Sequence, residues 1–262
     1  MTARQNAGTT APAPPTSALR RLRRINVALA VLHALQAAAV LALSNGFSIA
    51  VTASFAAGPP GTPPGEPESL FDLPVGAAVA AFLLLAAADH ALVAAPGVVR
   101  GYERGLVAHR NSFRWAEYSL SASVMIVLIA LLTGITDVDA LLAIFGVNAC
   151  MILFGWIMET TSAPGEPNWT AFWFGCIAGA VPWIAIVVAL VGAESDGDVP
   201  GFVYGIFVSL FLFFNSFAVN MALQYRQVGR WRSYLFGEAG YLVLSLVAKS
   251  ALAWQVFAGT LA

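Results

Sequence analysis

The chain has 262 residues, of which 59% are hydrophobic and only 10% are charged. A soluble domain is about 45–50% apolar and about 25% charged, so this composition excludes an ordinary soluble protein and indicates an integral membrane protein. The formal net charge of −1 provides no overall basic field that would attract a nucleic acid.

Seven apolar stretches of the chain are long enough to cross a bilayer, which takes about 20 helical residues. Segments rich in Pro, Gly and Asp, which are typical of turns, separate them. We therefore predict an all-α membrane protein, with a seven-helix bundle over residues 19–262 and a disordered cytoplasmic tail over residues 1–18. The predicted spans are residues 25–44, 76–99, 106–133, 138–160, 169–191, 202–225 and 234–260.

The connection between the first two spans has a pattern of its own. Apolar and small polar residues alternate from Phe47 to Phe55, a Pro/Gly-rich turn follows at 58–67, and a short apolar run covers 70–75. A period of two is typical of a strand. We predict an extracellular β-hairpin, whose exposed strand edge would make a contact in a homodimer.

The arginines indicate the orientation in the membrane. If the predicted spans alternate in direction, all twelve arginines fall on one side, in the N-terminal segment and in the connections 100–114 and 226–232. The connections on the other side carry acidic residues and neither lysine nor arginine. By the positive-inside rule, we expect a multi-pass plasma-membrane protein with a cytoplasmic N-terminus and an extracellular C-terminus.

The single lysine, Lys249, lies about fifteen residues inside the last span. A cation at that depth costs about 2.5–3.5 kcal/mol, so it needs either a neutralising partner or a chemical use. A neutral ε-amine can condense with an aldehyde to a Schiff base. Glu238, Tyr241 and Ser245 precede it at helical spacing and share its face.

Glu117 in the third span is the best partner for Lys249. Counted from the predicted outer ends of their spans, the two residues differ in depth by about 8 Å, which a lysine side chain and a small boundary error can close. A protonated Schiff base would need such a carboxylate as its counterion. The same pairing also fits a purely structural ion pair, in which the amine reacts with no aldehyde and the protein stays colourless.

Several other polar residues of the spans can be interpreted in two ways. His33 and His90 are either satisfied interior histidines or part of a proton-accepting network with Glu117. Glu159 and Glu238 lie near cytoplasmic ends and are either interfacial or part of a polar network. Asp89 reads as a partner for the neighbouring His90.

Patterns for other chemistry are missing from the sequence. No metal-ligand spacing and no nucleophile–base set is present, so neither a metal site nor an enzyme is predicted. The two cysteines, Cys150 and Cys176, fall inside apolar spans and are expected to be small buried side chains.

Several segments resemble heliorhodopsins, microbial-type retinal proteins with inverted membrane topology. They are RWAEYSLSASVM at 114–125, NACMILFGWIMETTS at 148–162, FNSFAVNMALQY at 214–225 and GEAGYLVLSLVAKSALAW at 237–254. The GPPG loop at 58–61 and the cytoplasmic N-terminus agree with this family. The resemblance covers nearly the whole chain after residue 20.

The resemblance implies a binding site for all-trans retinal. Lys249 would carry the retinal as a Schiff base, Glu117 would be its only counterion, and Ser245 would tune it by hydrogen bonding. His33 and His90 would form an inner polar cluster, with Glu159 and Glu238 in a network on the cytoplasmic side. The expected pocket lining is Tyr118, Asn148, Met151, Ile152, Gly155, Trp173 and Phe214, and the polar face of the third span adds Ser121 and Met125.

The resemblance also implies a dimeric light sensor with a slow light cycle and no obvious ion transport. The residues agree in part, because a light-driven proton pump of the usual kind has a second carboxylate about three turns along the third span. Here the position eleven residues after Glu117 is Leu128, and residues 124–132 contain no carboxylate. We expect a photoreceptor that acts on a cytoplasmic partner; a light-driven ion transporter or a light-gated channel is the alternative.

Overall fold

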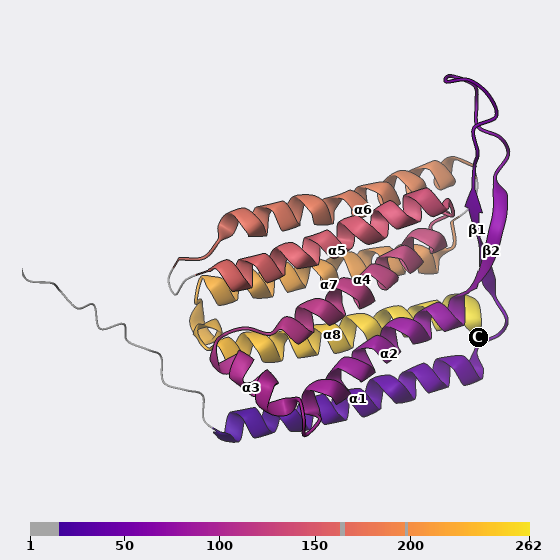
Figure 1. Cartoon of the computed structure of the whole chain (residues 1–262). Coiled ribbons are helices and arrows are strands. Elements are labelled where there is room, and N and C mark those ends of the chain that lie inside the picture. Colours follow the sequence, from indigo (N-terminus) through magenta and orange to yellow (C-terminus); the bar gives the residue numbers. More distant parts are fainter. Residues whose placement is uncertain (1–15, 163–165, 197–198) are drawn as a thin grey trace, which may run out of the picture.

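Seven long apolar helices run side by side in the computed structural model, which describes residues 16–162, 166–196 and 199–262 (Figure 1). Each is long and apolar enough to cross a membrane, and all seven predicted spans are confirmed as helices. They are α1 (Thr16–Leu43), α2 (Val75–Ala94), α4 (Ser112–Leu132), α5 (Val138–Thr161), α6 (Trp169–Asp196), α7 (Gly201–Tyr225) and α8 (Tyr234–Val256), which a π-helical turn (Phe257–Leu261) extends.

The first helix begins earlier than predicted. It starts at Thr16 instead of at residue 25, so residues 16–18 are not part of a disordered tail; the tail up to residue 15 lies outside the described residues. Leu22 explains the longer helix, because it is buried against Tyr102 and Leu106 at the end of the bundle. This first part of α1 is amphipathic, and a search for uniformly apolar spans misses it.

The predicted boundaries of the second and third spans are wrong. Helix α2 ends at Ala94, because Pro96 forces the preceding residue into an extended conformation, and a short helix α3 (Val99–Val107) follows. Helix α4 begins only at Ser112, where the side chain of Asn111 caps it by accepting the backbone N–H of Arg114. Asn111 and Arg114 are both buried, so α4 begins inside the bundle.

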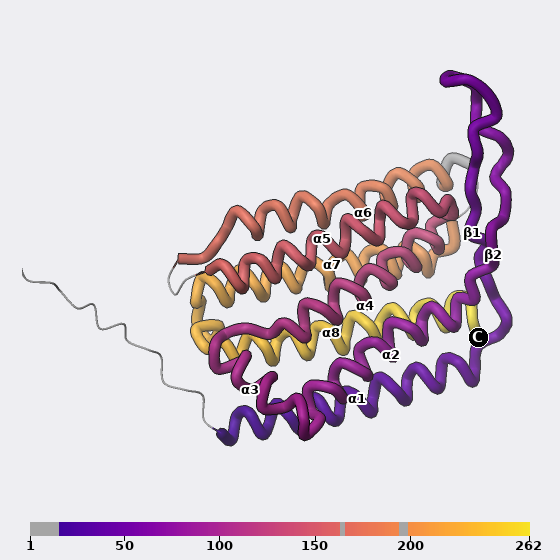
Figure 2. The backbone as a smooth tube through the Cα atoms, viewed as in Figure 1, coloured from indigo at the N-terminus to yellow at the C-terminus, as the bar shows by residue number. Residues whose placement is uncertain are grey.

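The predicted hairpin is confirmed as β1 (Ser48–Ala53) and β2 (Glu68–Pro74), which pair antiparallel. Figure 2 shows it standing at one end of the bundle and reaching beyond the helices, with the C-terminus at the same end. The backbone N–H of Thr52 donates to the carbonyl of Thr136 at 2.9 Å, which ties the outer edge of β1 to the connection between α4 and α5.

The two halves of the bundle differ in their interiors. Near the hairpin, the inner faces of α2, α4 and α8 form an apolar core that includes Phe82, Ile129 and Leu252. Towards the opposite end, where α3 and a 3-10 turn (Gly229–Arg232) lie, the interior holds buried charges such as Arg114 and Glu238. The polar chemistry therefore gathers in the half of the bundle that ends in the arginine-rich connections (Figure 1).

Candidate functional site

Lys249 meets Glu117 in the interior of the bundle, as the sequence predicted. Its Nζ donates to both carboxylate oxygens, at 2.9 Å to Oε1 and 3.2 Å to Oε2, and also to Ser245 Oγ at 2.9 Å. All three side chains are buried. The same ammonium lies 5.0 Å from the centre of the Tyr118 ring, which adds a cation–π contact.

Helix geometry explains why these side chains converge. Ser245 and Lys249 are four residues apart on the inner face of α8, and Glu117 and Ser121 have the same spacing on α4. Removing one partner of such a buried pair leaves an uncompensated charge, which costs about 3–5 kcal/mol. Neither partner can therefore be removed alone without this cost, and three oxygen atoms hold Lys249 in one place.

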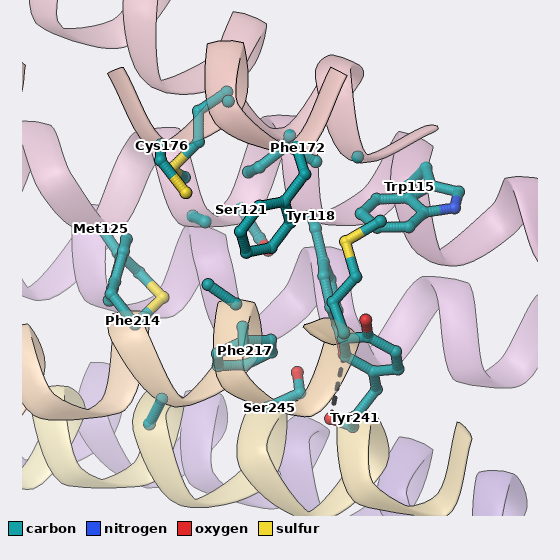
Figure 3. Close-up of a pocket in the computed structure, with 18 of the residues that line it drawn as sticks. Trp115, Tyr118, Ser121, Met125, Phe172, Cys176, Phe214, Phe217, Tyr241 and Ser245 are labelled. Carbon is teal, nitrogen blue, oxygen red and sulfur yellow. Dashed lines mark hydrogen bonds between the residues drawn. The ribbon is translucent and has the colours of Figure 1, made fainter. Parts of the chain in front are cut away.

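A cavity of about 140 Å³ opens directly beside this pair, between α4, α5, α6, α7 and α8. Its lining is almost wholly apolar and aromatic, with Lys249 and Ser245 in its wall. Figure 3 shows Phe172 of α6 and Phe217 of α7 in this lining, and the hydrogen bond from the Tyr118 hydroxyl to the Tyr241 carbonyl, which measures 3.0 Å. The space suits an extended apolar molecule with one end at the Lys249 nitrogen.

Most of the residues expected around this cavity do line it. Those found there are Tyr118, Ser121, Met125, Met151, Ile152, Gly155, Phe214, Ser245 and Lys249. Asn148 does not line it; its amide instead donates to Ser123 Oγ at 3.0 Å. Trp173 does not line it either, because it is 59% exposed on the outer face of α6, and the preceding residue Phe172 faces the cavity.

Sequence reasoning missed several lining residues and misjudged the cysteines. The missed aromatic residues are Trp115, Phe172, Phe217 and Tyr241. Both cysteines are exposed, contrary to the prediction, because Cys150 lies on an outward-facing position and Cys176 sits at the border of the cavity. Trp115 was recoverable, since it lies three residues before Tyr118 on the same helical face.

Gly155 shapes one wall of the cavity. A Cβ atom at this position would lie 2.5 Å from the Trp115 ring, so only glycine lets the indole pack against α5. The indole N–H donates to Glu159 Oε2 at 2.8 Å, which fixes the ring from its other side. The close approach of α4 and α5 thus depends on a residue without a side chain.

The two predicted histidines lie together but are not hydrogen-bonded to Glu117. Their rings stack with centres 5.7 Å apart and planes 6° apart. His90 Nδ1 lies 2.8 Å from Asn26 Oδ1, and neither ring nitrogen of His33 has a hydrogen-bond partner in the described part of the chain. The structure therefore shows a buried, stacked histidine pair in which His90 is hydrogen-bonded to Asn26 and not to Asp89.

Glu159 and Glu238 lie together around a residue that the sequence analysis had placed in a connection. Arg114, which belongs to α4, forms ion pairs with both carboxylates, and its Nη2 lies 2.8 Å from Glu159 Oε1. Asn111 donates its backbone N–H to Glu159 and its side-chain amide to Glu238, at 2.7 and 2.8 Å. These two glutamates therefore hold the buried start of α4, where a negative charge also suits the helix dipole.

Comparison with known proteins identifies the family. Residues 22–261 match the pattern of the Heliorhodopsin family. The chain belongs to the heliorhodopsin family. It is therefore a retinal protein of the membrane, as its seven spans and the Lys249 site had suggested.

Solved structures show the same fold. The heliorhodopsin chain is similar to a light-driven proton pump from Leptosphaeria maculans, with 15% identity, a TM-score of 0.63 and coverage of 94% of this chain and 96% of the other. It is also similar to a cyanorhodopsin from the cyanobacterium Tolypothrix sp. NIES-4075, with 11% identity, a TM-score of 0.61 and the same coverage. At these identities the likeness concerns the fold. Comparison with curated proteins gives no match.

The residues of the cavity fit a retinal. A retinal has a long apolar body and one aldehyde carbon, and here an apolar cavity ends at a buried primary amine. Ser121 Oγ and Tyr241 Oη in the cavity wall are buried and have no hydrogen-bond partner among the described residues.

Proposed function

We propose that this heliorhodopsin is a light sensor that binds all-trans retinal covalently at Lys249, as a protonated Schiff base, and that it is not an ion pump. The observation that carries the proposal is that Lys249, paired with the buried Glu117, lines the wall of an apolar cavity. Bound retinal would supply light absorption and a change of shape.

Each residue around Lys249 has a task in this proposal. Glu117 is the counterion, since both of its oxygens lie within 3.2 Å of the Lys249 nitrogen. Ser245 orients that nitrogen from its own helix at 2.9 Å. Met151, Ile152 and the aromatic residues of α6 and α7 exclude water and hold the apolar body of the ligand in line.

The interior beyond Lys249 supports a sensor over a pump. Leu128, the position at which a pump of the usual kind would carry its second carboxylate, is 1% exposed in the apolar core. Between the site and the hairpin end, the described core residues of α2, α4 and α8 are apolar or, like Ser123, carry a hydroxyl that does not titrate, so a proton has no chain of titratable groups to follow. Protons are thus kept in the half of the protein that ends in arginine-rich connections.

The signal would leave at the arginine-rich end. We place this end in the cytoplasm by the positive-inside rule, with the hairpin and the C-terminus outside the cell. Helix α3 and the turn at Gly229–Arg232 expose arginines there for a signalling partner. We also propose a homodimer, in which hairpins of two copies meet.

A light-driven transporter or light-gated channel is the second candidate. The observation that favours it is a group of buried carboxylates between the Lys249 site and the arginine-rich end of the bundle: Glu117, Glu159 and Glu238. This candidate leaves one step unexplained, because the apolar half of the bundle near the hairpin gives an ion no polar path to follow.

Photocurrent measured under voltage clamp separates the candidates. Cells that express the protein and are fed all-trans retinal should show a visible absorption band and no sustained current. Cells that express the Lys249→Ala variant are illuminated in the same way, and their current is subtracted as the control for heating. A steady current that needs no gradient would establish a pump, and a current that reverses with voltage would establish a channel.

A further inference from the structure

Asp89 is a membrane-embedded carboxylate that the functions described so far do not use. It lies on the face of α2 that also carries Phe82, Ala86 and Val93, which are buried in the bundle, and it is itself half-buried. Asp89 is five residues from the end of α2, and Glu117 is five residues from the start of α4. Each residue therefore lies about 7.5 Å along the helix axis from that end of its own helix.

The structure does not support the interpretation, made from the sequence, that Asp89 is a partner for His90. His90 uses its Nδ1 atom on Asn26, and no hydrogen bond or ion pair joins Asp89 to any residue in the described ranges. Without a direct ion pair, nearby hydrogen-bond donors and positive charges still favour the ionised form of a carboxylate. Arg114, which lines the same cavity as Asp89, forms its own ion pairs with Glu159 and Glu238.

Asp89 lines a second, small cavity that lies next to the retinal cavity. Its volume of about 20 Å³ exceeds the space of about 10–15 Å³ that one water molecule needs. Tyr118 and Tyr241 line both cavities and form the wall between them. The polar groups that share the small cavity with Asp89 include Asn26, His90, Tyr102, Arg114 and Glu238.

Two residues that line this small cavity carry a hydrogen-bond donor without a partner among the described residues. Arg114 Nε and Tyr241 Oη are buried and have no hydrogen-bond partner in the described part of the chain. Burial raises the pKa of Tyr102 above its ordinary value, which keeps that phenol neutral and able to donate. A water molecule held by such groups would connect Asp89 to its surroundings.

We propose that Asp89 is a second proton acceptor of the site: the proton that leaves the Lys249 nitrogen in the light cycle ends on a carboxyl oxygen of Asp89. This inference rests on the proposed function. The Lys249 nitrogen loses one positive charge and Asp89 loses one negative charge, so the net charge of the interior is unchanged. Glu117 keeps its charge, and no co-reactant is needed.

The chemistry of the neighbours favours Asp89 as the end point. A histidine that accepted the proton would become a buried cation within the stacked pair of His33 and His90, and a buried unpaired charge is costly. A carboxylate that accepts the proton becomes neutral. In this proposal Asp89, which lines the same cavity as His90, holds the proton. Glu238, Asn111 and Arg114 close the far side of the cavity.

Infrared difference spectra recorded with and without light test this inference on the retinal-loaded protein. We expect a light-induced carbonyl band of a protonated carboxylic acid, which is lost in Asp89→Asn and moves in frequency in Asp89→Glu. The control is Glu103→Gln, a carboxylate of α3 outside both cavities, which should leave the band in place. In the unmodified chain, isotope-labelled aspartate should move the same band, so the test does not depend on the folding of a variant.

The outcomes separate this inference from the proposed function. A coloured protein whose carboxylic acid band persists in Asp89→Asn and ignores labelled aspartate would overturn the role of Asp89 alone. A coloured protein with no carboxylic acid band at all would point to a histidine acceptor and would overturn it equally. A protein that stays colourless with retinal would instead remove the proposed function and this inference with it.

Discussion

Arg114 Nη2 lies 2.8 Å from Glu159 Oε1 in a part of the bundle where both side chains are at most 5% exposed. The arginine also contacts the aromatic rings of Trp115 and Tyr241, with its guanidinium carbon 4.4 and 4.0 Å from their centres. Trp115 and Tyr241 line the retinal cavity. The ion pair thus supports the cavity wall as well as the start of α4.

Replacing this arginine should destabilise the protein strongly. Arg114→Leu leaves Glu159 and Glu238 buried without a cation, and we expect a loss of about 3–5 kcal/mol of unfolding free energy. Denaturant unfolding in mild detergent measures it. Arg110→Leu, at an exposed position, is the control and should stay within about 0.5 kcal/mol of the original protein. Equal stabilities for the two variants would show that the ion pairs contribute nothing.

Removing the amine of Lys249 should remove the colour. Lys249→Ala cannot form a Schiff base, so protein purified with all-trans retinal should show no visible absorption band. The control is Ser250→Ala, the next residue on α8, which does not line the cavity. A visible band in Lys249→Ala as strong as in the control would mean that the pair with Glu117 is structural.

Neutralising the counterion should shift the band. Glu117→Gln removes the negative charge that stabilises the positive charge at the Lys249 nitrogen, and we expect an absorption maximum at longer wavelength. Absorption spectra of purified pigment measure the shift, with Glu103→Gln as the matched neutralisation away from the site. An unchanged maximum in Glu117→Gln would transfer the counterion role to another carboxylate.

A methyl group at Gly155 should disturb the cavity. Its Cβ would lie 2.5 Å from the Trp115 ring, so in Gly155→Ala the indole has to move. We expect a lower yield of pigment and a shifted absorption maximum. Gly146→Ala, on the same helix, has no atom within 4 Å of the added carbon and should gain helix propensity without a change of spectrum. Identical spectra for both variants would contradict the close packing of α4 and α5.

The two neighbouring aromatic residues of α6 should behave differently. Phe172 lines the cavity, whereas Trp173 is 59% exposed on the outer face. We expect Phe172→Ala to shift the absorption maximum and Trp173→Ala to leave it unchanged. Spectra with the opposite pattern would place Trp173 against the retinal and would reverse the orientation of α6 described above.

The sequence predicted the features that have strong local signals. Seven uniform apolar stretches, the alternation around β1, and a single lysine opposite one carboxylate at similar depth are each visible without a structure. The pairing of Lys249 with Glu117 followed from counting residues along helices, because the rise per residue is constant.

The missed features depend on tertiary contacts. Helix α6 is apolar on all sides, so its sequence does not show that Phe172 faces inwards and Trp173 outwards. Arg114 was assigned to a connection because arginines near the ends of spans usually face water. Its burial depends on Glu159 and Glu238, which lie 45 and 124 residues further along the chain.

The contact between Thr52 and Thr136 limits how copies of this protein can assemble. A two-stranded sheet normally has two open edges, and copies that add strand to strand at both edges can grow into fibres. Here the α4–α5 connection occupies the outer edge of β1 at Thr52, which leaves β2 with the free edge. A sheet with one free edge can join one other sheet and then has no further place for growth. Pairing through β2 would therefore stop at two molecules, so many copies could occupy one membrane without being cross-linked.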